Sequence, residues 1–231
     1  DIWGFSIPRL LGIEGRLEAN KDKKIVPYKR GGLEVVSTGL ITDDEDTALM
    51  WRGLMLSKAL EQFLFDVEWG NLDYLVIDLP PGTGDIQMAL GRLLPQTELV
   101  VVTTPQLSAQ KVATRVADMA KRSFIPLLGV VENMSYFESG DGNKYNIFGK
   151  GGGDELSEKF GIPLLSKIPI SEDSIEESEN GTPILLQNNK TPTKEAMQNL
   201  VNTIIKILPP VSDETCTGRL AKVLEELEVE A

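Results

Sequence analysis

The sequence has 231 residues, 41% of them hydrophobic and 25% charged, as in an ordinary globular protein with one sizeable core. It has no histidine and one cysteine, Cys216, which excludes histidine-dependent catalysis, histidine metal sites and a disulfide within this chain, and fits a cytoplasmic location. The formal net charge of −12 argues against nucleic acid or an anionic membrane as the main partner, because both require a basic surface.

Apolar runs alternate with helical patterns along the chain. Helices are predicted around 56–67, 109–120 and 195–208, where apolar residues fall on one face. Five short runs rich in Val, Ile and Leu, each followed by a polar or glycine turn, are typical of buried parallel strands: EVVSTGL (34–40), DYLVIDL (73–79), ELVVVTT (98–104), LLGVVEN (127–133) and LLSKIPI (164–170). The alternation predicts an α/β fold, a doubly wound and mostly parallel sheet with helices on both faces, which binds ligands at the carboxyl ends of its strands.

Two further segments complete the organisation. The turn-rich segment 136–155 predicts a hairpin or loop before a short helix. The segment 211–231 predicts a tail with a short amphipathic helix, following a domain that spans 1–210. Membrane anchoring would require a polar face rich in Lys and Arg, and this tail is acidic instead.

The octapeptide DLPPGTGD (78–85) is the segment most specific for function. Asp78 ends an apolar run, in the position where P-loop enzymes place the carboxylate that supports magnesium. The backbone N–H groups of Gly82 and Gly84 can approach a terminal phosphate closely, because glycine has no side chain. Asp85 is expected to cap the helix that follows. The alternative is an ordinary strand–turn–helix junction.

Together with WRGLM (51–55), VVTTPQ (101–106), VVENMS (130–135) and IFGKGGG (147–153), this octapeptide resembles the Mrp/NBP35 family. Members of that family are P-loop ATPases related to MinD and ParA that act as iron–sulfur cluster carriers or scaffolds. The resemblance runs from Asp1 to about Leu208. It implies binding of ATP and Mg²⁺, a homodimer, and apoprotein clients or scaffold proteins as partners.

The resemblance also assigns residues. Asp1 matches the second aspartate of the first switch, near magnesium and the attacking water, and Asp78 matches the carboxylate that holds magnesium through a water. The second switch corresponds to Gly82, Thr83, Gly84 and Asp85. Asn133 matches the asparagine that reads the adenine edge, with a turn-forming asparagine as the alternative. Pro169 matches a proline that lines the base. The resemblance assigns no functional role to Arg52, and a structural salt bridge is an equally good interpretation of this residue.

Two departures from the family pattern stand out. The family's phosphate loop precedes the first switch, where this sequence begins, so the first strand and P-loop are expected to be missing and the fragment alone is expected to be inactive. GKGGGDE (149–155) does not replace that loop, because it lacks the second lysine and the hydroxyl residue. The family's Cys-x-x-Cys is replaced by ESGDGNKYN (138–146), so ligands for a 4Fe-4S cluster are absent from that position.

The leading hypothesis is therefore an ATP-hydrolysing carrier or assembly factor for iron–sulfur clusters. One alternative is a positioning ATPase of the ParA or MinD kind, which would require a basic surface or a basic amphipathic terminus. Another is a non-catalytic binding module that keeps the switch loops.

Overall fold

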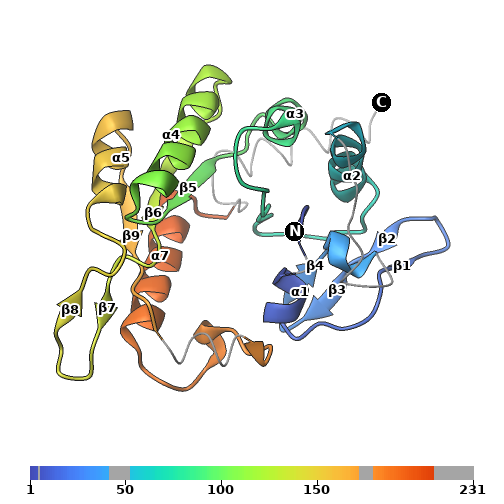
Figure 1. Ribbon diagram of the computed structural model, residues 1–231. Coiled ribbons are helices and arrows are strands. Elements are labelled where there is room, and N and C mark those ends of the chain that lie inside the picture. Colours follow the sequence, from blue (N-terminus) through green and yellow to red (C-terminus); the bar gives the residue numbers. More distant parts are fainter. Residues whose placement is uncertain (5, 42–52, 172–178, 211–231) are drawn as a thin grey trace.

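The structure is a computed structural model that describes residues 1–4, 6–41, 53–171 and 179–210 (Figure 1). Arg52, Cys216 and the predicted tail helix lie outside these residues. The elements of the first part are α1 (Ser6–Leu10), β1 (Glu18–Ala19), β2 (Ile25–Val26), β3 (Tyr28–Arg30), β4 (Leu33–Val35), η1 (Thr38–Leu40), α2 (Gly53–Phe65) and α3 (Asp85–Leu93). The elements of the second part are β5 (Leu99–Thr103), α4 (Leu107–Arg122), β6 (Leu127–Glu132), β7 (Phe137–Glu138), β8 (Lys144–Tyr145), α5 (Gly152–Phe160), β9 (Leu164–Lys167), η2 (Ile184–Leu186) and α7 (Pro192–Ile207).

The second part is built on a parallel sheet with the strand order β5-β6-β9. Val101 pairs with Val130 across the first two strands, and Val131 pairs with Ser166 across the next two. Helices α4 and α5 contact each other and the sheet, while α7 lies against β9 (Figure 1). The three strands predicted at 98–104, 127–133 and 164–170 are confirmed, as are the flanking helices and the hairpin that precedes a short helix.

The predicted buried strand at 34–40 is wrong. Leu33–Val35 instead forms the second arm of an antiparallel hairpin with Tyr28–Arg30, and the chain then turns into the short helix η1. The hairpin turn consists of Gly31 and Gly32, with φ angles of 56° and 83°. Two consecutive residues with positive φ are what a tight hairpin turn requires, and glycine adopts them without steric cost. The Gly-Gly pair therefore sets the direction of this segment.

The predicted strand at 73–79 also does not form. Its backbone is assigned to no strand, and it contacts Ile2, whose N–H donates to the Asp78 C=O over 3.3 Å. Val76 in the middle of the run is 87% exposed. A strand exists only when a neighbour pairs with it, and no described residue forms a ladder with this run. The apolar pattern of this run predicts buried side chains, whereas most of them are exposed in the structure.

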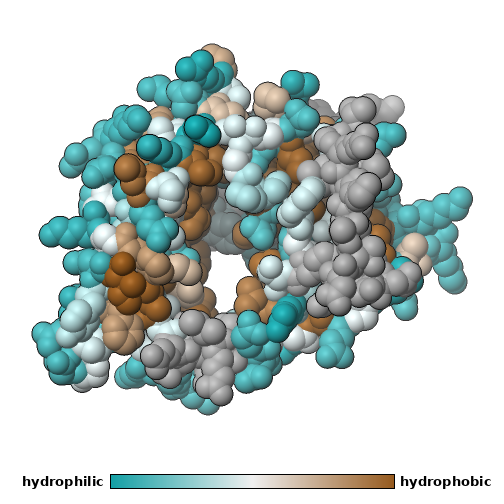
Figure 2. All heavy atoms as spheres, in the orientation of Figure 1, coloured by the Kyte–Doolittle hydropathy of each residue, from teal (hydrophilic) through white to brown (hydrophobic). Residues whose placement is uncertain are grey.

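The described residues form separate hydrophobic clusters rather than one core. In the first part, Leu60 and Phe63 of α2 pack against Ile86 and Leu90 of α3 and against Ile2. In the second part, the apolar faces of α4 and α5 pack on β5 and β6; the buried residues are Val101, Ala113, Ala117, Val130 and Leu156. Figure 2 shows an opening between the two parts, with apolar residues on both sides of it.

Polar contacts join the two parts on the side of α1. Arg9 forms an ion pair with Glu179 over 2.7 Å. The guanidinium of Arg30 donates to the carbonyl oxygens of Gly12 (2.6 Å) and Gly181 (3.3 Å). The two glycines approach so closely that a Cβ atom on Gly181 would lie 2.5 Å from the Gly12 Cα atom. Both positions therefore require glycine for packing.

None of the helices in the described ranges is both long and apolar enough to cross a lipid bilayer.

Gly129 in β6 tests the packing of the sheet. A Cβ atom at this position would lie 2.6 Å from both the Leu165 Cγ and the Pro163 carbonyl oxygen. We expect Gly129→Ala to lower the free energy of unfolding by about 2 kcal/mol, because a buried strand must shift to admit the methyl group. Gly140→Ala is the matched control, since its Cβ would meet nothing within 4 Å. Equal urea midpoints for the two variants would contradict the packing described here.

Candidate functional site

Asp1 lies between the segment that follows β4 and the end of the 73–79 run. Its backbone nitrogen donates to the Val36 C=O over 3.1 Å, and its own C=O accepts from the Thr38 N–H over 3.2 Å. The carboxylate accepts hydrogen bonds from Gly4 N–H (2.8 Å), Ile7 N–H (3.4 Å) and the Ser37 hydroxyl (3.2 Å). The carboxylate is thus held in one orientation at the start of α1, where N–H groups favour a negative charge.

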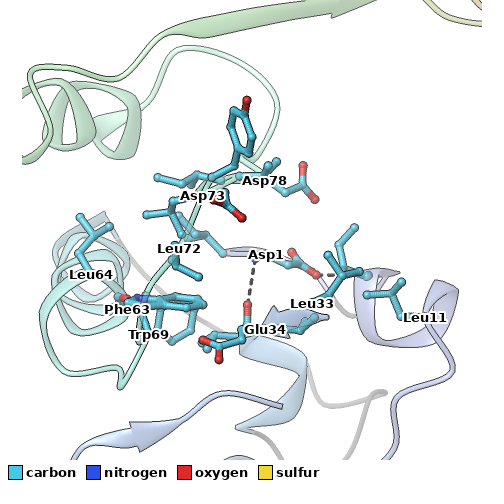
Figure 3. A pocket seen from close by; sticks show the side chains of 18 of the residues that line it. Asp1, Leu11, Leu33, Glu34, Phe63, Leu64, Trp69, Leu72, Asp73 and Asp78 are labelled. Carbon is cyan, nitrogen blue, oxygen red and sulfur yellow. Dashed lines mark hydrogen bonds between the residues drawn. The ribbon is translucent and has the colours of Figure 1, made fainter. Parts of the chain in front are cut away.

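The structure brings Asp78 next to Asp1. The backbones of Asp78 and Ile2 are hydrogen bonded, and both aspartates line a cavity of about 440 Å³ (Figure 3). The Asp78 side chain is exposed, and no described residue donates a hydrogen bond to its carboxylate. This carboxylate is therefore open to an added ligand, whereas that of Asp1 is already bonded on three sides.

The cavity itself combines apolar walls with acidic groups. Figure 3 shows Phe63, Leu64 and Trp69 on one side of the cavity, Asp73 beside Asp78 at its top, and Glu34 at its bottom. Its described lining includes no Lys or Arg. A triphosphate carries several negative charges, so these residues alone would repel it. Carboxylate oxygens do suit Mg²⁺, which proteins bind through one or two carboxylates together with substrate phosphates.

The glycine loop after Asp78 leads into α3. Gly82 has a φ angle of 96°, a backbone conformation that favours glycine. The expected cap of α3 is wrong in detail: Gly84 occupies the N-cap position in extended conformation, and Asp85 is the first residue of the helix. Asp85 still places a negative charge in the first turn, where it stabilises the helix dipole. The side chains of Thr83 and Asp85 are exposed beside the loop.

Asn133 and Pro169 lie together at the ends of β6 and β9. The Asn133 N–H donates to the Thr103 C=O over 2.7 Å, and its side-chain oxygen accepts from the Met134 N–H over 2.9 Å. No residue in the described part of the chain accepts a hydrogen bond from the Asn133 amide NH₂ group. Pro169 is buried, and its C=O accepts from the Thr193 hydroxyl over 3.1 Å. The structure gives no contact between this pair and the Asp1–Asp78 group, so the predicted site falls into two groups.

Glu132 is a site residue that the sequence reasoning missed. It precedes Asn133, is 1% exposed, and accepts hydrogen bonds from the Gly153 N–H (2.6 Å) and the Ser135 hydroxyl. Asn133 lies in the turn that follows Glu132. These hydrogen bonds attach that turn to the first residues of α5. The available signal was a charged residue at the end of the run LLGVVE, since a buried carboxylate requires hydrogen-bond donors around it.

The hairpin β7–β8 occupies the position of the family's cysteine pair. At its tip, Ser139 and Asn143 hydrogen bond to Asp141. The bond from the Ser139 hydroxyl, followed by those from Asn143, lowers the pKa of Asp141. Within the described ranges, His, Cys, Asp and Glu side chains form no group of three able to hold a metal ion. The hairpin is thus closed by its own hydrogen bonds.

A parallel sheet with flanking helices, together with an aspartate that directly precedes a glycine loop, is typical of the nucleotide-binding α/β proteins to which P-loop NTPases belong. The nucleotide-binding protein from Archaeoglobus fulgidus, solved in complex with ADP, superposes with a TM-score of 0.67 at 33% identity, covering 84% of this chain and 75% of that one. The MinD cell division protein of Aquifex aeolicus, solved as a MinC:MinD complex, shares the fold with a TM-score of 0.51 at 18% identity, covering 85% of this chain and 69% of that one.

The family model described as NUBPL iron-transfer P-loop NTPase matches residues 1–205, and the chain belongs to this family. Iron-sulfur cluster carrier proteins from Aquifex aeolicus and Bacillus subtilis are 40% and 38% identical to it, over 90% and 88% of the chain. The same matches cover 58% and 57% of those two relatives, so the chain spans somewhat more than half of their length. The resemblance inferred from the motifs is thereby confirmed.

Proposed function

We propose that this chain carries the switch residues of an ATP-hydrolysing iron–sulfur cluster carrier. The observation that supports this most directly is the pairing of a fixed carboxylate, Asp1, with an open one, Asp78, directly before a glycine loop, in a chain of the iron-transfer P-loop NTPase family. Binding of ADP by the similar Archaeoglobus fulgidus protein supports a nucleotide ligand.

The two aspartates have different roles in this proposal. Asp78 holds a water of the Mg²⁺ coordination shell, since its carboxylate is exposed and has no donor among the described residues. Mg²⁺, when bound, neutralises charge on the phosphates. A carboxylate offers about four acceptor positions, and Asp1 uses three of them, so it keeps one that can orient the attacking water. The water is thus placed by a carboxylate that cannot itself rotate.

The second group completes the nucleotide site. The amide NH₂ group of Asn133, which no described residue uses, can donate to an acceptor nitrogen on an edge of adenine, and Pro169 supplies an apolar wall behind it. Because Asn133 lies in the part built on β5, β6 and β9 while Asp78 lies in the other part, ATP would contact both. Residues 1–231 alone are proposed to hydrolyse ATP negligibly, since the described lining of the acidic cavity includes no Lys or Arg side chain to bind the triphosphate.

The cargo is the less direct part of the proposal. Relatives named as iron-sulfur cluster carrier proteins support a cluster or an apoprotein client as partner, with a homodimer as the working assembly and the cytoplasm as its location. The hairpin at 137–145 offers no thiolate, so a 4Fe-4S cluster would have to be held by ligands other than that hairpin.

ATP hydrolysis by the complete protein with Mg²⁺ tests this proposal. We expect Asp1→Asn to lower kcat about 100-fold, because the amide has a single oxygen and no negative charge, so it has fewer acceptor positions left to orient the water. Asp22→Asn, an exposed change in the β1–β2 turn, removes the same charge and should leave turnover unchanged. A complete protein that neither binds nor hydrolyses ATP would refute the proposal, as would full activity of Asp1→Asn.

A further inference from the structure

Gln87 is a polar side chain buried against the glycine loop. It lies in the first turn of α3 and is 4% exposed. Its Oε1 accepts from the Gly84 N–H over 2.8 Å, and its Nε2 donates to the carbonyl oxygens of Pro80 and Gly82, both over 3.0 Å. Both amide protons and the amide oxygen are thus engaged by three backbone groups of one loop.

The helix holds this amide in place. Ile86 and Leu90, on either side of Gln87 along α3, are 2% and 3% exposed in the hydrophobic cluster of the first part. The loop has no comparable anchor of its own, because Gly82 and Gly84 lack side chains and glycine has the greatest backbone freedom. Hydrogen bonds to a buried amide exclude water and are stronger for that reason. Gln87 therefore anchors the backbone of the loop to α3.

The same contacts determine which N–H groups remain free. Gly84 N–H is occupied by Gln87, so it cannot bind a phosphate in this arrangement, contrary to the expectation from sequence. No described residue accepts from the N–H groups of Gly82 and Thr83. The two free donors are adjacent and follow the exposed Asp78 closely in the chain.

We propose that Gln87 is a positioning residue that fixes the loop Pro80–Gly84 so that the N–H groups of Gly82 and Thr83, and not that of Gly84, face the terminal phosphate of the nucleotide. This inference deepens the proposed function and rests on it for the identity of the ligand. Gln87 itself does not touch the nucleotide; it acts through the backbone of the loop.

Gln87→Glu is the sharpest variant, because it keeps the shape of the side chain and the acceptor for Gly84 while replacing two donors by an oxygen that repels the carbonyls of Pro80 and Gly82. Gln87→Met keeps length and helix propensity without any hydrogen bond. Gln62→Glu, an exposed change on α2, is the control for added charge.

Hydrogen–deuterium exchange of the full chain, resolved to 80–85, measures the loop without requiring catalysis. We expect Gln87→Met to speed exchange at Gly84 about tenfold, as loss of roughly one buried hydrogen bond implies. Gln87→Glu keeps the acceptor for Gly84 but loses the two bonds to the loop carbonyls, so it should speed exchange there to a smaller extent, with α4 unchanged and Gln62→Glu like the wild type. Unchanged exchange at Gly84 in both variants would overturn the proposal, and so would equal acceleration in the loop and in α4, which indicates general unfolding.

Steady-state kinetics of the complete protein provide the readout that a merely structural role would not change. We expect Gln87→Glu to lower kcat about tenfold while KM for ATP stays within about twofold, since the loop orients the reacting phosphate and other groups bind the nucleotide. An unchanged kcat would overturn the positioning role. If the wild-type protein shows no ATP turnover, the proposed function fails, whereas the exchange measurement still decides whether Gln87 fixes the loop.

Discussion

Replacing Asp78 by asparagine is expected to lower kcat for ATP hydrolysis by the complete protein about 100- to 1000-fold, the loss typical of removing one preorganised charge in an active site. The reason is electrostatic: Asp78 is the open carboxylate of the site, and an amide of the same shape cannot hold a water on Mg²⁺ with a full negative charge. The fold should be unaffected, because the side chain is exposed and bonded to no described residue.

Two readouts separate this effect from a general loss of function. The Mg²⁺ concentration for half-maximal rate should rise in Asp78→Asn, whereas the urea midpoint should match the wild type. Asp66→Asn, an exposed change at the end of α2, is the charge-matched control and should keep normal turnover. Normal turnover in Asp78→Asn itself would remove this residue from the catalytic site.

The largest expected effect on stability is that of Glu132→Ala. This change leaves the Gly153 N–H and the Ser135 hydroxyl buried without an acceptor, and we expect the free energy of unfolding to fall by about 3 kcal/mol. Glu132→Gln keeps one oxygen for Gly153, and the Ser135 hydroxyl can turn to accept from the new amide. That variant should therefore lose only about 1 kcal/mol.

Urea unfolding monitored at equilibrium measures both variants, with an unchanged slope showing that the unfolded state is the same. Glu158→Gln on the exposed face of α5 provides the control and should stay within about 0.5 kcal/mol of the wild type. If the Glu132→Ala variant were as stable as the Glu132→Gln variant, the two donors would have found other acceptors. The buried carboxylate would then not organise the turn at Asn133.

The sequence predicted the strands that have neighbours and failed where a neighbour was lacking. β5, β6 and β9 pair with one another, so their Val- and Leu-rich runs form a sheet as the pattern indicates. DYLVIDL (73–79) has the same pattern, yet it forms no strand. Whether another strand lies beside it depends on the tertiary structure, which a local sequence pattern does not reveal. At 34–40 the sequence does contain a local signal for the observed structure, because Gly31-Gly32 directly before the run favours a hairpin turn.

The candidate site was predictable to a similar extent. The motif around Asp78 and the family resemblance together suggested Asp1, and the structure places the two aspartates side by side. Spacing alone does not predict that pair, since Asp1 and Asp78 are distant in sequence. Gln87 was within reach of local reasoning, because a Gln three residues after an N-cap is a recognised capping arrangement. The role of Glu132 was harder to predict from sequence, since the Gly153 N–H that donates to it belongs to a later helix.

The described residues form one hydrophobic cluster under α2 and α3 and another under α4 and α5, and this division affects how ligand binding would change the stability of the protein. Each cluster stabilises its own elements, and the two parts are joined by polar contacts near α1 and by the hydrogen bond from the Tyr74 hydroxyl to the Leu208 C=O (2.6 Å). A molecule that contacts Asp78 on one side and Asn133 on the other would add a further link between the parts that contain these two clusters. Its binding would then stabilise both clusters together, because unfolding of either part would release it.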